Sequence, residues 1–195
     1  QGRGEQPALI YDSPVTNTIK KYSYSELRNE VAKFAGGLQN LGITKGDTVV
    51  IYMPVIPESM IAMLACARIG AVHSVVFGGF APQELSVRID DAQPKLIISA
   101  SYGIEVDKLI PYKSLIDEAV KRSQHKPAYK IFFQRKPGYD ALNGKDELDF
   151  LNVLEKGTAA DCVPLLSTDP LYIIYTSGTT GKPKGVIRDN GGYAT

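Results

Sequence analysis

The chain has 195 residues, and because 44% of them are hydrophobic it can form a sizeable core. Its 22 Lys and Arg residues are balanced by 21 Asp and Glu residues, and a net charge of +1 without a basic cluster argues against a nucleic-acid partner. No apolar run approaches the roughly 20 residues that span a bilayer and no secretory signal opens the chain, so we expect a soluble protein with no membrane partner.

The first part of the chain predicts a β-hairpin followed by a helix. Residues 8–11 and 19–22 have strand composition on either side of a turn. Ser23 and Glu26 have the spacing of a capping box, and apolar residues then recur every three or four positions until Gly42, which would end the helix. This apolar stripe is typical of a helix face that packs on a core.

Two glycines interrupt the predicted helix. Glycine in a helix interior costs about 1 kcal/mol relative to alanine, yet Gly36 and Gly37 both lie on the helix. We therefore expect another backbone to pack against the helix at this pair.

The middle of the chain alternates between strands and helices, which predicts an α/β fold with mainly parallel sheets layered with helices. Strand-like segments lie at 48–53, 72–77, 95–100 and 129–133, and helices begin at Pro57, Pro82 and Tyr112. The first three strands should be neighbours. The helix from Pro57 is apolar nearly all round, so we expect it to be buried.

Three connections complete this part of the chain. We expect a loop at 101–111, a surface excursion at 134–145 and a short amphipathic helix at 146–156. Gly78 and Gly79 directly follow a strand, which is where open α/β sheets bind ligands, although a strand-to-helix turn explains them equally well.

The cysteines and histidines show no sign of a metal site. Cys66 and Cys162 lie far apart without a CxxC or His-rich context, and the apolar run 63–67 favours a buried, inert thiol at Cys66. His73 and His125 lack triad or metal spacing, so we interpret both as structural or solvated. This cysteine usage favours a reducing, intracellular location, in the cytoplasm or, in a eukaryote, the mitochondrial matrix.

A glycine-rich loop near the end of the chain has the composition of a polyphosphate site. The apolar runs 171–174 and 186–187 flank it and predict two buried strands. Glycines let main-chain amides approach an anion closely, hydroxyls donate to phosphate oxygens or ligate Mg²⁺, and lysines add positive charge. The loop contains Gly178, Gly181 and Gly185, the hydroxyls of Thr176, Ser177, Thr179 and Thr180, and the lysines Lys182 and Lys184.

This loop differs from the P-loop of the common NTPases. That motif needs a glycine where Thr176 stands and a Ser or Thr where Pro183 stands. Proline also biases the preceding residue away from helical angles, so we expect the loop to continue into a strand. The structural alternative is a hairpin tip with solvated lysines, but the ordered combination favours nucleotide phosphates.

The run from Tyr175 to Gly185, with its continuation 188–193, resembles the signature loop of AMP-forming short-chain acyl-CoA synthetases in the adenylate-forming superfamily. Within them it looks more like propionyl-CoA than acetyl-CoA synthetases. The resemblance covers nearly the whole chain and implies that residues 1–195 are a fragment, a partial N-terminal AMP-binding domain. Its implied substrates are ATP with Mg²⁺, a short-chain carboxylate such as acetate or propionate, and coenzyme A.

The resemblance also implies roles for individual residues. The loop would hold the β and γ phosphates of ATP through Thr176, Ser177, Gly178, Thr179, Thr180, Gly181, Lys182 and Lys184. Thr179 and Lys184 are the implied catalytic residues, with Lys184 favoured over Lys182 for offsetting charge on the departing pyrophosphate.

Coenzyme A contacts follow from the same resemblance. The family segment that matches Phe77, Gly78 and Gly79 borders the coenzyme A channel. Short-chain relatives carry two arginines where this chain has Glu105 and Lys108; a carboxylate repels phosphate, so Lys108 is the candidate contact.

Three functions remain open at this point. The chain is part of an active ligase, a nucleotide-binding relative without ligase activity, or an α/β scaffold segment with a structural loop. Residues that bind adenine, shape the acyl pocket and supply a second catalytic lysine in the family have no counterpart here, so we expect the 195-residue chain alone to be inactive.

Overall fold

The computed structural model describes residues 2–106, 108–136, 138–176 and 183–194. Its helices are α1 Tyr24–Asn40, α2 Pro57–Arg68, α3 Pro82–Ala92, α4 Tyr112–Arg122, α5 Phe150–Lys156 and α6 Asn190–Ala194. The strands of the central sheet are β3 Thr48–Met53, β4 Val72–Phe77, β5 Leu96–Ala100, β8 Tyr129–Phe133, β9 Glu147–Asp149, β10 Pro170–Thr176 and β11 Lys184–Asp189. Two hairpins consist of β1 Pro7–Ser13 with β2 Thr18–Ser23 and β6 Tyr102–Glu105 with β7 Lys108–Pro111.

The central sheet has the order β11-β10-β4-β3-β5-β8-β9 and confirms the predicted α/β fold. Strand β3 pairs in parallel with both β4 and β5, and β5 pairs in parallel with β8. Residues 49–52 and 96–98 are fully buried, as expected of strands that are covered by helices on both faces. Only the hairpin β10–β11 adds an antiparallel pair to this sheet in the described chain.

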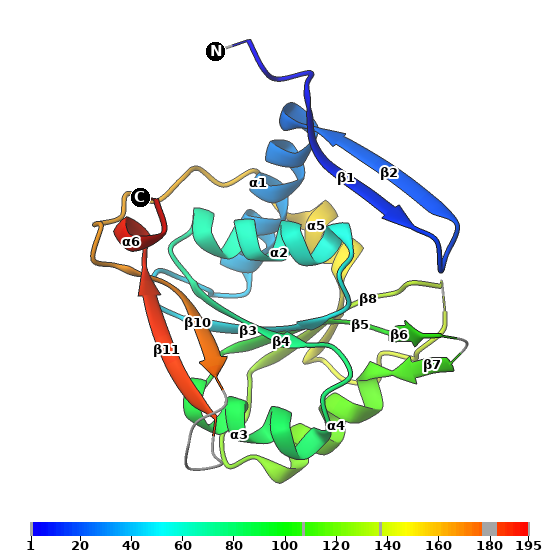
Figure 1. Cartoon of the computed structure of the whole chain (residues 1–195). Coiled ribbons are helices and arrows are strands. Elements are labelled where there is room, and N and C mark those ends of the chain that lie inside the picture. Colours follow the sequence, from blue (N-terminus) through cyan, green and yellow to red (C-terminus); the bar gives the residue numbers. More distant parts are fainter. Residues whose placement is uncertain (1, 107, 137, 177–182, 195) are drawn as a thin grey trace.

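Helices cover both faces of the sheet because of the order in which its strands are connected. The step from β3 to β4 crosses the sheet in one direction, and the steps from β4 to β5 and from β5 to β8 cross it in the other. Since such crossovers are right-handed, α2 lies on one face and α3 and α4 lie on the opposite face. Figure 1 shows α1 and α5 beside α2, which completes three layers.

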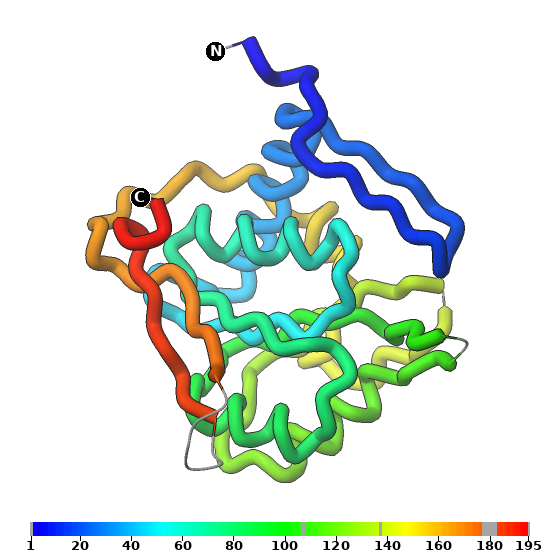
Figure 2. Tube along the Cα trace, in the orientation of Figure 1, coloured from blue at the N-terminus to red at the C-terminus, as the bar shows by residue number. Residues whose placement is uncertain are grey.

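The N-terminal hairpin and helix α1 form as predicted. Strands β1 and β2 are antiparallel and project from one corner of the molecule (Figure 2). The backbone N–H of Glu26 donates to the Ser23 hydroxyl at 3.2 Å, and that of Ser23 donates to the Glu26 carboxylate at 2.8 Å. These two bonds confirm the capping box.

Two predicted boundaries were wrong. Residues 101–111 form a hairpin instead of a loop, because apolar side chains there suit strands and Ile104 pairs with Leu109 across it. The predicted helix 146–156 begins with strand β9, which pairs with β8. Helix α5 starts only after Asp149, whose carboxylate caps it by accepting from the Asn152 N–H at 3.0 Å.

Two segments that we expected to be buried are partly exposed. In α2, Met60 and Leu64 are 37% and 40% exposed, and they form one wall of an open apolar groove of about 570 Å³ whose other wall comes from β10. In the hairpin β10–β11, Ile174 of β10 and Ile187 of the edge strand β11 are 49% and 63% exposed. Apolar composition predicted burial, but the described residues cover these side chains only in part. Among the described helices, none has the length and apolar composition that a membrane crossing requires.

A partly buried ionic cluster ties α4 to strands β8 and β9. The carboxylate of Glu147 accepts from Lys113 Nζ at 2.9 Å, from Lys130 Nζ at 3.0 Å and from the Asn143 N–H at 2.9 Å. Burial by itself would raise the pKa of Glu147, but these three hydrogen bonds outweigh it and lower the pKa to about 2.

Glu147→Gln is expected to destabilise the protein by about 1–2 kcal/mol at pH 7, since Asp117 and Asp146 still partner the lysines. The Glu147 pKa is lower in the folded state, so its stabilisation is complete above the unfolded value of about 4.3 and is lost as pH falls to about 2. In urea titrations, the free energies of unfolding of the wild type and of Glu147→Gln should converge as the pH falls from about 4.3 to about 2. The control Glu118→Gln breaks an exposed pair with Arg122 and should change stability by less than about 0.5 kcal/mol. If the stability difference between the wild type and Glu147→Gln stays constant from pH 7 to pH 2, the lowered pKa of Glu147 is refuted.

Candidate functional site

The carboxyl ends of β3 and β4 form a crevice in the sheet. The chain leaves β3 towards α2 on one face and leaves β4 towards α3 on the other, and such a switch point is where open α/β sheets bind ligands. A pocket of about 330 Å³ lies there. It is lined by Met53, Pro54, Val55, Phe77, Gly78, Gly79, Phe80, Ile104, Glu105, Ile110 and Tyr112.

The turn at 77–80 contains the predicted coenzyme A segment. A buried tyrosine, Tyr52, stabilises it through two hydrogen bonds. The Tyr52 hydroxyl accepts from the Gly79 N–H at 3.1 Å and donates to the Phe80 carbonyl at 2.8 Å. Burial raises the pKa of Tyr52 to about 12, so its hydroxyl keeps its proton at neutral pH. The turn therefore has a fixed conformation at the edge of the pocket.

Both glycines of the turn also have a structural role. Gly79 has φ +104°, where side chains are strained, and an added Cβ at Gly78 would lie 2.5 Å from the Tyr112 hydroxyl oxygen. The turn requires glycine at these positions with or without a ligand. The glycines alone thus do not assign the pocket; its position at the switch point is the independent observation.

The predicted phosphate loop connects β10 to β11, and its two ends are adjacent. Thr176 at the end of β10 pairs with Lys184 at the start of β11. As expected, the chain after Pro183 enters a strand and not a helix. The predicted residues Ser177, Gly178, Thr179, Thr180, Gly181 and Lys182 lie outside the described residues.

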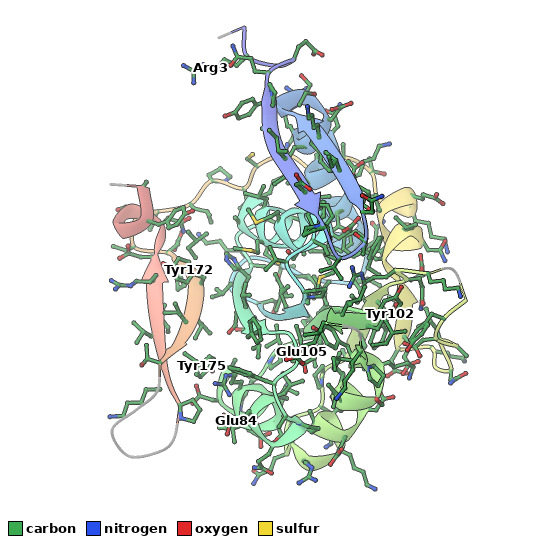
Figure 3. All side chains as sticks on the ribbon, turned by 45° about the vertical axis from the view of Figure 1, so that its right-hand side comes forward. Arg3, Glu84, Tyr102, Glu105, Tyr172 and Tyr175 are labelled. Atoms are coloured by element: carbon green, nitrogen blue, oxygen red, sulfur yellow. The ribbon has the colours of Figure 1, made fainter. Side chains whose placement is uncertain are left out.

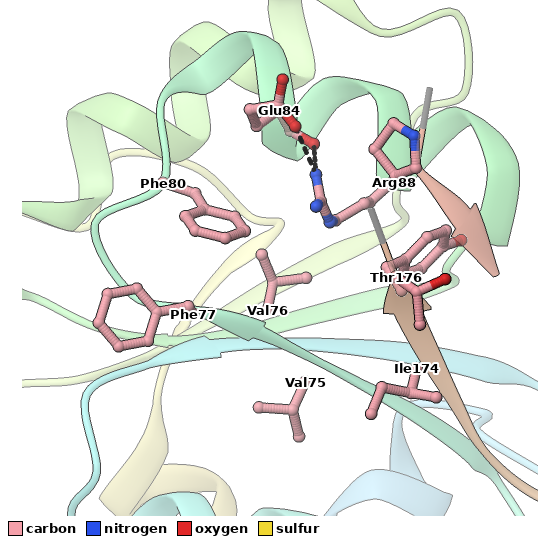
Figure 4. A pocket seen from close by; sticks show the side chains of 10 residues that line it. Val75, Val76, Phe77, Phe80, Glu84, Arg88, Ile174 and Thr176 are labelled. Carbon is pink, nitrogen blue, oxygen red and sulfur yellow. Dashed lines mark hydrogen bonds and ion pairs between the residues drawn. The ribbon is translucent and has the colours of Figure 1, made fainter. Parts of the chain in front are cut away.

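A second pocket, of about 430 Å³, joins the two predicted sites. Strand β10 pairs with β4 at only one position, Tyr172 with His73, and the strands diverge beyond it. Phe77 of the predicted coenzyme A segment and Thr176 and Pro183 of the predicted phosphate loop line the gap (Figure 4). The structure therefore places both predicted segments at one edge of the sheet.

Sequence reasoning missed the residues of α3 that line this second pocket. The buried Arg88 donates through Nη1 to the Glu84 carboxylate at 3.0 Å, and its guanidinium lies 5.0 Å from the Phe80 ring centroid. Figure 4 shows Arg88 between the turn and β10. The available signal was the Glu84–Arg88 spacing of four, which places an ion pair on one helix face.

The β6–β7 hairpin brings Glu105, not Lys108, to the first pocket. The two residues are paired in the hairpin, and Lys108 is exposed and does not line the cavity. The Glu105 carboxylate therefore places negative charge at the pocket where the resemblance implies a contact with coenzyme A phosphate.

Cys66, His73 and His125 are packed into the core or used structurally. Cys66 is fully buried, and burial raises its thiol pKa to about 12, as expected for an inert thiol. Burial lowers the pKa of His73 to about 4, and His125 Nε2 lies 2.8 Å from the Pro94 carbonyl oxygen. In the described part of the chain, no three His, Cys, Asp or Glu side chains gather as a metal site.

Known proteins resemble this chain over its whole length. The family model of AMP-binding enzymes matches residues 1–195. The human protein "Acyl-CoA synthetase short-chain family member 3, mitochondrial" is 55% identical over 99% of this chain and 28% of its own length. The acetyl-coenzyme A synthetase of Serratia proteamaculans is 46% identical over 98% of this chain and 30% of its own length.

The fold is also that of a solved structure. An acyl-CoA synthetase of Brucella canis superposes with a TM-score of 0.79, at 23% identity, over 95% of this chain and 31% of its own. The chain therefore spans about three tenths of the length of the relatives that it matches.

Proposed function

The chain belongs to the family of AMP-binding enzymes, and from that premise we propose that it is part of an AMP-forming short-chain acyl-CoA synthetase. In the proposed reaction, a carboxylate oxygen of acetate or propionate attacks the α-phosphorus of ATP. The products are an acyl-adenylate and pyrophosphate. The thiol of coenzyme A then attacks the acyl carbon and releases AMP.

One observation supports this proposal above the others. The two segments that the sequence assigns to ATP and to coenzyme A line one pocket, although about a hundred residues separate Phe77 from Thr176. Two half-reactions that share an acyl-adenylate need their substrates within reach of one site. A nucleotide-binding protein without ligase activity needs no such pairing.

The proposal assigns roles to the described ends of the phosphate loop. Lys184 would offset the charge of the departing pyrophosphate, and the residues from Thr176 onward would position the outer phosphates. Mg²⁺ enters with ATP, and hydroxyl oxygens such as that of Thr176, exposed at the pocket rim, are ligands that it accepts. The exposed thiol of Cys162 favours a reducing, intracellular compartment.

The decisive experiment is exchange of labelled pyrophosphate into ATP by the full-length protein. We expect exchange that depends on both the carboxylate and Mg²⁺, and AMP with acyl-CoA once coenzyme A is added. Parallel reactions with acetate and propionate rank the two acids. Binding of ATP without exchange would identify a nucleotide-binding relative without ligase activity, and absence of ATP binding would identify a structural loop.

Tyr52→Phe is expected to raise the KM for coenzyme A about tenfold while pyrophosphate exchange stays within about twofold. The change leaves the Gly79 N–H without its acceptor and the Phe80 carbonyl without its donor, so the turn loses its fixed conformation. The measurement is thioester formation from a preformed acyl-adenylate. Tyr129→Phe, at the opposite end of the sheet, is the control, and an unchanged KM in Tyr52→Phe would show that the turn does not contact coenzyme A.

A further inference from the structure

The two strands that carry the phosphate loop both meet helix α3 at one carboxylate. Tyr175 of β10 donates its hydroxyl hydrogen to Asp91 at 2.7 Å. Gly185 of β11, the register partner of Tyr175, comes so close that an added Cβ would lie 3.1 Å from the same Asp91 oxygen. Asp91 therefore lies close to both strands at the base of the loop.

The ring of Tyr175 is held by the same helix. The Arg88 guanidinium lies 5.4 Å from the Tyr175 ring centroid and 5.0 Å from that of Phe80. Glu84, Arg88 and Asp91 are spaced by four and three residues, so they lie on one face of α3. Figure 3 shows Tyr175 beside Glu84, with which it lines one pocket, and Figure 4 shows Arg88 beside Phe80 and Glu84.

These contacts with α3 lie at the end of the hairpin that, in the described structure, is not paired with the rest of the sheet. Beyond the single pair of Tyr172 with His73, β10 has no ladder to β4 among the described residues, and 184–188 are exposed. The Tyr175 pKa is raised by burial and by the bond to Asp91, so the phenol remains a hydrogen-bond donor. The contacts of α3 are thus what fixes the loop end of the hairpin.

The same helix also begins at the coenzyme A segment. Only Ala81 separates the turn at 77–80 from Pro82, the first residue of α3, and Phe80 contributes both to that turn and to the contact with Arg88. We propose that Asp91 is a positioning residue, an inference that rests on the proposed function. Through Tyr175, Asp91 fixes the position of the phosphate loop relative to the coenzyme A segment. It does not touch substrate and acts through the loop.

The test compares Tyr175→Phe, Asp91→Ala and Asp91→Asn with the wild type in the full-length protein. Tyr175→Phe and Asp91→Ala are expected to raise the KM for ATP in pyrophosphate exchange about fivefold, because each removes one hydrogen bond. The double variant should lose no more than either single variant. Asp91→Asn should recover most of the loss, since its amide oxygen accepts the same bond, and thioester formation from preformed acyl-adenylate should stay within about twofold.

Asp90→Ala is the matched control. This neighbouring carboxylate accepts from the Gln124 and His125 N–H groups at 2.7 and 3.0 Å, so its loss should lower the melting temperature without changing the KM for ATP. Additive losses, no rescue by asparagine, or an unchanged KM in Asp91→Ala would overturn the positioning role. If the wild type itself shows no pyrophosphate exchange, the proposed function is wrong. That outcome is distinct from a failure of the positioning role alone.

Discussion

Lys184→Ala in the full-length protein is expected to raise the activation free energy of acyl-adenylate formation by about 2–4 kcal/mol, which slows this step roughly 30- to 1,000-fold. Lys184 is exposed at the first position of β11 and pairs with Thr176, so it directly follows the predicted phosphate loop. Pyrophosphate gains charge as it leaves, and a lysine on its outer oxygens therefore interacts more strongly with the transition state than with bound ATP. The rate should fall more than the ATP affinity.

Assaying the two half-reactions separately decides the role of Lys184. Thioester formation from a preformed acyl-adenylate involves no pyrophosphate and should be largely unaffected. Arg188→Ala is a matched control, because it removes one positive charge from an exposed position four residues along the same strand. Equal loss in both half-reactions of a folded Lys184 variant would indicate a structural lysine, and no loss in either would transfer the role to Lys182.

Gly36→Ala is expected to destabilise the full-length protein by about 2–3 kcal/mol. Helix propensity alone predicts the opposite, a gain of about 1 kcal/mol. The structure reverses the sign because an added Cβ at Gly36 would overlap the Thr158 carbonyl oxygen and lie 2.8 Å from its carbonyl carbon. Gly157 faces the helix in the same way, because an added Cβ there would lie 2.7 Å from the Gly37 nitrogen, so backbone packs on backbone on both sides.

The denaturant midpoint measures this effect. Lys33→Ala, an exposed position on the same helix, should change stability by less than about 0.5 kcal/mol. A Gly36→Ala variant that is as stable as the wild type, or more stable, would show that the segment at 157–158 moves away from α1 at little cost.

Most helices and strands could be predicted because their signals are local. The Ser23–Glu26 capping box, the prolines at the starts of α2 and α3, and the apolar runs of β3, β4 and β5 each specify an element from a few neighbouring residues. Strand and helix alternation then restricts the connections to right-handed crossovers, which predicted the parallel sheet. The loop from Thr176 to Lys184 was recognisable for the same reason, since its residues are consecutive.

The tertiary structure alone decided which distant residues meet. Asp91 and Tyr175 are 84 residues apart, and no local pattern joins them; the strand order places α3 beside β10. Exposure likewise depends on neighbours, so the apolar composition of α2 and β11 predicted burial that the described chain does not provide. The sequence by itself therefore determined the elements and the loop chemistry, whereas packing between distant segments decided how the loop is held and which predicted site residues share a pocket.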